Sequence, residues 1–387
     1  MQMMIELSKY LKVPKLTTEK SPLNFGDYFD WIGGTSTGAM IACALTKGTP
    51  LAVVRKLYFT FKDDILTGSR PYDETKLEAL FASEMDGSQR MADVLSRYQK
   101  HLILMATRVD RMPPLLTLFR SYSYPPGEAP DQESFKKGKE EEEDSSNNFP
   151  APQSTSLWRA LRASSAAPTY FTAAPPYIDG GMLANNPTLD MLTEYYRYQA
   201  ALERSAYRKS FTFSSSSSSK VLKTSSQESP TALKLLLSFG NGQMRRTVAP
   251  PAQPELYDRL YSLLSFRSLL RDFRALSACS ELVGQVKSIV TNCSDHIVWR
   301  ADSWAAATGA AFFRLNPLLS KKIALNETDD GELMNGLWEV KVYAVERAAE
   351  LKQLAAVMDA LYRMKMKKEK EEVKAKDEEE GAGSCSV

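Results

Sequence analysis

The chain has 387 residues, with 49 lysines and arginines against 47 aspartates and glutamates, and therefore a net charge of +2. A charge this close to zero removes the clustered basic surface that nucleic-acid binding needs, so no nucleic-acid partner is predicted. With 43% hydrophobic and 25% charged residues, the composition is that of a globular protein with a sizeable core. Two histidines and four cysteines, without CxxC or HExxH spacing, predict no metal site.

The N-terminus and the cysteines indicate where the protein works. Residues 1–7 lack the basic region and apolar run of a signal peptide, and the scattered cysteines are typical of free thiols in a reducing compartment. The sequence also has no uninterrupted apolar stretch of about 18 residues, which a membrane-spanning helix needs. We therefore expect a cytoplasmic protein; these features leave surface association with a membrane open.

Helix-like and strand-like segments alternate along the chain. Helices are predicted at residues 1–12, 39–47 and 50–63, and strands at 28–33, 101–107, 177–179 and 233–240. In the first helix, Met3, Met4, Leu7 and Leu11 form an apolar stripe. This alternation predicts an α/β fold in three layers, with a mostly parallel central sheet and helices on both of its faces.

Two segments of low hydrophobicity interrupt this pattern, and a third ends the chain. They are residues 128–154, residues 210–229 and the charged residues 363–387. Such segments bury too little apolar surface to offset the entropy lost on ordering, so we expect two disordered insertions. The charged tail is expected to begin as a helix that frays into a solvated, disordered end. Residues 1–362 would then form one domain, because the strand and helix patterns resume after each insertion.

Gly34-Thr35-Ser36-Thr37-Gly38 matches the pattern G-x-S-x-G between a predicted strand and a predicted helix. A nucleophile elbow requires this setting, because the sharp turn leaves the serine hydroxyl exposed above the sheet. Gly34 and Gly38 remove side chains that would collide, and the N–H of Thr37 can donate to an oxyanion at the start of the helix. The bare pattern also arises by chance, so the interpretation depends on the flanking elements.

A serine nucleophile needs a base, and the sequence offers three candidates. Asp179 ends a predicted strand, and Gly180 and Gly181 let its loop approach another loop closely; burial would raise its pKa toward that of a base. The alternative for this motif is an ordinary Asp-Gly-Gly turn. His296 follows the serine as in a Ser–His–Asp triad but has no clean strand before it, and His101 is expected to be a partly exposed strand-end residue.

The serine and aspartate motifs together resemble those of the patatin-like phospholipases, which use a Ser–Asp dyad without histidine. The resemblance includes residues 162–171, Arg-Ala-Ser-Ser-Ala-Ala-Pro-Thr-Tyr-Phe, ahead of the aspartate. Within the family the chain is most similar to the animal calcium-independent phospholipases A2, in segments that occur in order over most of residues 25–350. These segments are residues 68–72, 183–188, 238–242, 313–317 and 337–339.

The resemblance implies a patatin-like catalytic domain that cleaves glycerophospholipid acyl esters, chiefly at the sn-2 position. Ser36 would form the acyl intermediate and Asp179 would be the base, with no cofactor and no metal; the chain has no calcium-loop pattern. It also implies a phospholipid membrane surface as the place of work and a homodimer formed through the catalytic domain. Separately, the basic residues 363–368, with Met364 and Met366 among them, permit a calmodulin contact.

The chain departs from the family at its beginning. Members have a strand and a glycine-rich oxyanion loop before the first helix, whereas residues 1–12 correspond to that helix. Removal of one oxyanion donor typically lowers the rate about 10²–10³-fold. Because the serine and aspartate motifs are both intact, we expect an N-terminally incomplete catalytic domain rather than an inactive one. The alternatives are an inactive patatin-like lipid-binding or scaffold protein and a Ser–His–Asp esterase that uses His296.

Overall fold

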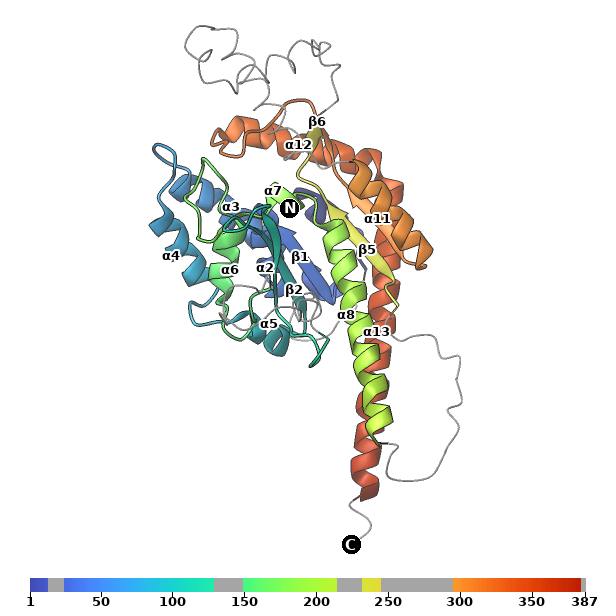
Figure 1. Cartoon of the computed structure of the whole chain (residues 1–387). Helices are drawn as coiled ribbons and strands as arrows, with labels where there is room; N and C mark the ends of the chain where they lie inside the picture. The colour runs from blue at the N-terminus through green and yellow to red at the C-terminus, as the bar shows by residue number, and fades with distance from the viewer. Residues whose placement is uncertain (13–23, 129–148, 214–231, 245–294, 384–387) are drawn as a thin grey trace, which may run out of the picture.

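A computed structural model describes residues 1–12, 24–128, 149–213, 232–244 and 295–383 (Figure 1). The strands are β1 (Trp31–Thr35), β2 (His101–Arg108), β3 (Leu115–Arg120), β4 (Tyr177–Asp179), β5 (Leu235–Phe239), β6 (Gln243–Met244), β7 (Ala311–Leu315) and β8 (Leu318–Leu319). The helices are α1 (Gln2–Ser8), the 3-10 helix η2 (Phe25–Tyr28), α2 (Thr37–Thr46), α3 (Leu51–Ile65), α4 (Glu74–Glu84), α5 (Met91–Tyr98), α6 (Leu157–Ser164), α7 (Gly181–Ala184), α8 (Thr188–Phe213), α11 (Asp295–Ala307), α12 (Asp330–Glu346) and α13 (Ala348–Gly383).

Strand β2 is the centre of the main sheet. On one edge β1 runs parallel to it, and β4 runs antiparallel to its last residues, which places Asp179 opposite Ala106. On the other edge β3 is antiparallel, because the short connection 109–114 returns the chain directly. Two further parallel pairs, β5–β7 and β6–β8, complete the described strands. The sheet is therefore mixed rather than mostly parallel as predicted.

Both faces of the main sheet are buried, as the alternate side chains of β2 show. Leu102, Leu104 and Ala106 belong to the main hydrophobic core, with residues of α2 and α6, whereas Ile103 and Met105 pack with residues of α7 and α8. Successive side chains of a strand point to opposite faces, so helices cover β2 on both sides. The predicted three-layer α/β fold is confirmed (Figure 1).

Helix α1 forms where the apolar stripe predicts it, although it ends at Ser8 rather than at residue 12. Met3, Met4, Leu7 and Leu11 are all buried in the main core. Residues of α13 lie in the same core, so α1 joins the beginning of the chain to its last helix.

The structure describes the ends of both predicted insertions, and these ends are ordered. Glu128 is buried and forms ion pairs with Arg204 and Arg208 of α8, and residues 149–154 are also placed. Helix α8 itself extends to Phe213, into the second predicted insertion. The rest of both insertions, residues 129–148 and 214–229, lies outside the described residues.

Of the predicted tail, residues 363–383 lie in helix α13, which ends at Gly383, and residues 384–387 lie outside the described residues. Ion pairs one helical turn apart support this extension: Lys367 with Glu371 and Lys368 with Glu372. Each such pair contributes about 0.3–0.5 kcal/mol to an exposed helix.

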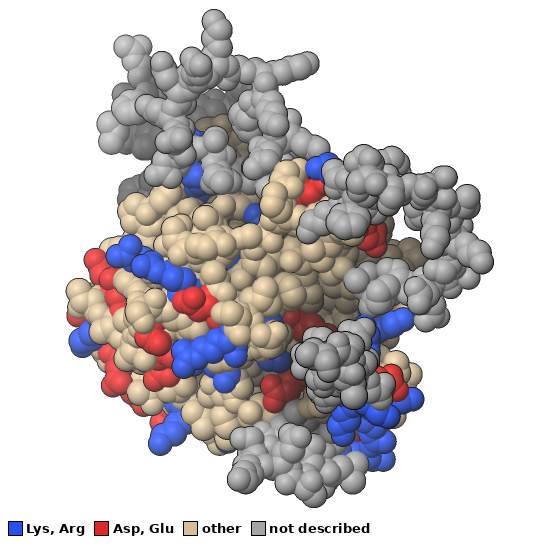
Figure 2. All heavy atoms as spheres, turned by 90° about the horizontal axis from the view of Figure 1, so that it is seen from below, with Lys and Arg blue, Asp and Glu red and all other residues tan. Residues whose placement is uncertain are grey.

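The surface reflects the near-zero net charge. Figure 2 shows basic and acidic side chains interspersed on the face seen from below. Among the helices of the described ranges, none is both long enough and apolar enough to cross a membrane.

Candidate active site

Ser36 occupies a one-residue turn between β1 and α2. Its backbone has φ 57° and ψ −125°, a region that residues with a side chain rarely adopt. The carbonyl of Ser36 accepts the N–H groups of Ala39 and Met40, which starts the helix at once. As the first residues of α2, Thr37 and Gly38 have no intrahelical acceptor for their own N–H groups.

The glycines of this turn do not have equal roles. A Cβ at Gly34 would lie 2.2 Å from the carbonyl oxygen of Gly38, whereas a Cβ at Gly38 would have nothing within 4 Å. At the aspartate loop, a Cβ at Gly180 would lie 2.2 Å from the carbonyl oxygen of Met105. Gly34 therefore lets the end of β1 pack against the start of α2, and Gly180 lets the aspartate loop pack against the backbone of β2.

We expect Gly34→Ala to lower the free energy of unfolding by about 3 kcal/mol, because the clash is with backbone that can move little. Gly38→Ala is the matched control: it adds the same methyl group in open space inside a helix, where alanine is favoured by about 1 kcal/mol. Urea unfolding of both variants measures the difference. Equal midpoints would contradict this account of the turn.

Ser36 and Asp179, which are 143 residues apart, form a hydrogen bond. Ser36 Oγ donates to Asp179 Oδ2 at 2.5 Å, and the N–H of Gly181 donates to Asp179 Oδ1 at 2.7 Å. The aspartate is only 5% exposed. Burial raises the pKa of Asp179 to about 6, while the hydrogen bonds from Ser36 and Gly181 act to lower it. At neutral pH the carboxylate is therefore ionised and placed to accept the proton of Ser36.

Two buried hydroxyl groups beside this pair join the serine turn to the aspartate loop. Ser164 Oγ accepts the N–H of Ser36 at 3.1 Å, and the Ser164 carbonyl accepts the N–H of Gly180 at 3.3 Å. Thr35 Oγ1 donates to the carbonyl of Ala184 at 2.8 Å. Neither role can be found in the sequence, because no local pattern reveals a hydrogen bond to a distant loop.

The two histidines lie elsewhere. His101 is the half-buried first residue of β2, where its ring stacks on Trp31 with centroids 4.3 Å apart, so the strand-end prediction is confirmed. His296 is exposed on α11, with its ring 5.5 Å from that of Trp299. The Ser36 hydroxyl donates to Asp179 instead.

Within the described ranges, no group of three or more His, Cys, Asp or Glu residues could hold a metal ion. Cys43 is a free, buried thiol, and the other three cysteines lie outside those ranges.

A serine on a strained strand–helix turn, hydrogen bonded to a buried aspartate in a three-layer α/β domain, is the architecture of a serine hydrolase. The family model of the patatin-like phospholipases matches residues 10–192, a range that contains both Ser36 and Asp179. Residues 10–192 of the chain therefore match the patatin-like phospholipase family.

Two similar curated proteins are phospholipases A2 by name. The chain is 31% identical over 332 residues to the mouse 85/88 kDa calcium-independent phospholipase A2, an alignment that covers 86% of this chain and 36% of that protein. It is 28% identical over 333 residues to the intracellular phospholipase A2 of Caenorhabditis elegans, covering 86% of this chain and 26% of that protein. The chain thus spans roughly a third or less of the length of these relatives.

Proposed function

We propose that the protein is a lipid acyl hydrolase that cleaves fatty-acyl esters of glycerophospholipids, chiefly at sn-2, through an acyl-Ser36 intermediate. The observation that carries the proposal is the 2.5 Å hydrogen bond from Ser36 Oγ to Asp179 Oδ2, in a region that matches the patatin-like phospholipase family. The names of the mouse and nematode relatives support a phospholipid substrate.

In the first half of the reaction, Asp179 takes the proton of Ser36 while Oγ bonds to the ester carbonyl carbon. The carbonyl electrons move onto the oxygen, which faces the start of α2, where the Thr37 N–H is free to donate. When the intermediate collapses, the bond to the glycerol oxygen breaks and Asp179 returns the proton to it. The products are a lysophospholipid and acyl-Ser36.

In the second half, water takes the place of the lysophospholipid. Asp179 removes a proton from the water as its oxygen attacks the acyl carbon, and the proton then passes to Ser36 Oγ as the fatty acid leaves. One carboxylate serves both steps because its pKa of about 6 keeps it ionised, yet basic, at neutral pH. Nothing in this sequence of steps calls for a calcium ion.

The proposal places the protein in the cytoplasm, in peripheral contact with a phospholipid membrane. A homodimer through the catalytic domain and a calmodulin contact at residues 363–368 stay predictions. The esterase alternative would require His296 to reach Ser36, and the exposed position of His296 on α11 does not favour it.

The function is tested with phosphatidylcholine vesicles in which the sn-1 and sn-2 chains carry different labels. We expect fatty acid to be released chiefly from sn-2, at the same rate with or without a calcium chelator. His296→Ala should keep this rate, whereas a Ser–His–Asp esterase would lose it. A folded protein that binds the vesicles but releases no fatty acid would instead be the lipid-binding scaffold. A requirement for calcium would contradict the mechanism.

A further inference from the structure

A hollow of about 520 Å³ lies between α3 and α12, outside the Ser36–Asp179 site. Its lining combines large apolar side chains with cations and contains no carboxylate; the residues that matter here are Arg55, Lys56 and Phe59 from α3 and Met334, Trp338 and Lys341 from α12. We call this hollow, together with the exposed side of α12 next to it, the α3–α12 face.

The apolar residues of α12 extend beyond the hollow as a stripe. Met334, Trp338, Val342 and Val345 are spaced four, four and three residues apart, which places them on one side of the helix. All are exposed, Trp338 to 65% and Val345 to 74%. Single exposed apolar residues are ordinary, but an aligned row that includes a tryptophan marks an interaction surface.

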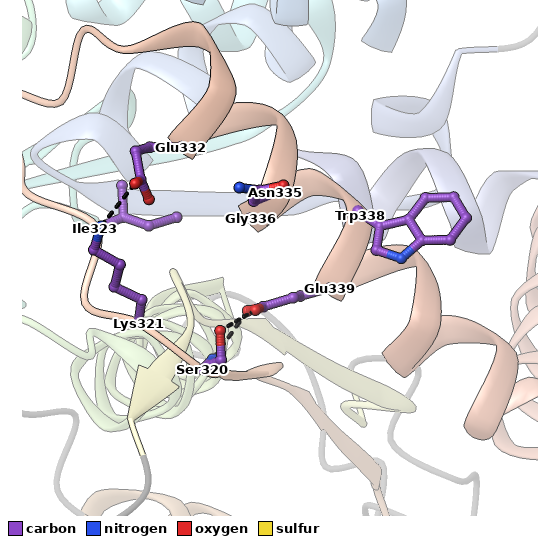
Figure 3. A pocket seen from close by; sticks show the side chains of 8 residues that line it. All are labelled: Ser320, Lys321, Ile323, Glu332, Asn335, Gly336, Trp338 and Glu339. Carbon is purple, nitrogen blue, oxygen red and sulfur yellow. Dashed lines mark hydrogen bonds and ion pairs between the residues drawn. The ribbon is translucent and has the colours of Figure 1, made fainter.

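The acidic residues of α12 nearest to Trp338 are engaged elsewhere. Glu332 pairs with Lys321, and Glu339 accepts hydrogen bonds from Ser320. Figure 3 shows these pairs in a neighbouring hollow, with the ring of Trp338 directed away from them. The α3–α12 face is therefore cationic around Trp338.

The cations of the face are largely uncompensated. Arg55 donates to the neutral amide of Gln2 at 3.1 Å. Lys56 and Lys341 are exposed, and neither is paired with a carboxylate among the residues that the structure describes. An apolar row beside unpaired cations is the composition that binds an anionic lipid surface, where tryptophan occupies the headgroup region and lysine contacts lipid phosphates or carboxylates.

We propose that the α3–α12 face docks the protein on anionic phospholipid membranes. The proposal rests on the proposed function, since it supplies the surface on which the phospholipase would work. Figure 1 places α12 at the end of the molecule where α7 follows the dyad aspartate, so docking there turns the site-bearing end toward the lipid. A second copy fits less well, because a twofold contact would bring Arg55, Lys56 and Lys341 of both copies together.

The test uses the full chain with Ser36→Ala, so that binding is measured without catalysis. Binding is followed by sedimentation with two kinds of vesicle, one of phosphatidylcholine alone and one that also contains phosphatidylserine. We expect the phosphatidylserine vesicles to bind more tightly. Trp338→Ala should weaken binding about tenfold. Lys56→Gln with Lys341→Gln should weaken it about 25-fold, roughly fivefold for each cation, on the anionic vesicles only. Trp299→Ala is the matched control, since Trp299 is 63% exposed on α11; its binding should not change.

Unchanged binding by Trp338→Ala, or an equal loss in Trp299→Ala, would overturn the proposal. It would also be overturned if sedimentation velocity showed that Trp338→Ala splits a dimer while vesicle binding persists, because the face would then bind a second copy. With Ser36 restored, Trp338→Ala should hydrolyse a dispersed short-chain phospholipid at the parent rate. Failure of the parent to hydrolyse either substrate, with vesicle binding intact, would refute the proposed function and leave the docking surface standing.

Discussion

Ser36→Ala is expected to lower phospholipid hydrolysis by about 10⁶-fold, the size of loss that follows removal of the nucleophile from a serine hydrolase. The variant lacks the oxygen that bonds to the acyl carbon, and Asp179 then has no hydroxyl proton to accept. The measurement is the initial rate of fatty-acid release from labelled vesicles. Labelling of the parent by a fluorophosphonate probe, lost in the variant, locates the nucleophile independently.

Ser83→Ala is a suitable control for this experiment. Ser83 Oγ donates to the carbonyl of Leu80 within its own helix, α4, so its removal should leave the rate within a few-fold of the parent. Circular dichroism should show that both variants are folded, because alanine at position 36 keeps the same backbone contacts. If Ser36→Ala retained hydrolysis and labelling, Ser36 would not be the nucleophile.

Asp179→Asn is expected to lower the rate by about 10²–10⁴-fold, the usual contribution of a general base. An amide keeps the size of the side chain but has no affinity for the Ser36 proton at neutral pH. In the parent, the rate should rise about tenfold per pH unit up to about pH 6 and then level off, because Asp179 with a pKa of about 6 must be ionised to act. That limb of the profile should be missing in Asp179→Asn.

The same substitution is expected to stabilise the protein at alkaline pH. Burial raises the pKa of Asp179 from 3.8 to about 6, so the folded state holds this proton more tightly than the unfolded state does. The stabilisation by that proton is fully present below about pH 4 and is lost as the pH rises through about 6, a difference of about 3 kcal/mol. Asp179→Asn avoids the buried charge and should gain up to this amount at pH 8 and nothing at pH 4.

Asp190→Asn is the matched control for both readouts. Burial also raises the pKa of Asp190, on α8, to about 6, but Asp190 does not bond to Ser36. Its replacement should change the pH dependence of unfolding in the same direction and leave the rate near that of the parent. Equal losses of rate in the two variants would show that Asp179 has no special part in the chemistry.

The local features of the fold follow from the sequence alone. The apolar stripe of α1, the strands β1, β2 and β5 and the start of α2 after the serine turn all depend on neighbours a few residues away. The same local information identified the serine and aspartate motifs, since each lies at the end of a strand and contains glycines. It did not fix where the helix of the charged tail ends, because high charge favours fraying whereas ion pairs one turn apart support a helix.

Only the tertiary structure decided which of these residues meet. Asp179 reaches Ser36 because β4 pairs antiparallel with the end of β2, on the edge that β1 also occupies, and that register is a property of the assembled sheet. The buried Ser164 and Thr35 join the two loops for the same reason, and no periodicity distinguishes them from other hydroxyl residues. The cations of the α3–α12 face are a further example. The composition gives only their number, whereas the packing of α3 beside α12 gathers Arg55, Lys56 and Lys341 near the exposed Trp338. Local sequence sets propensities, and contacts between residues far apart in the chain arise only when those elements pack.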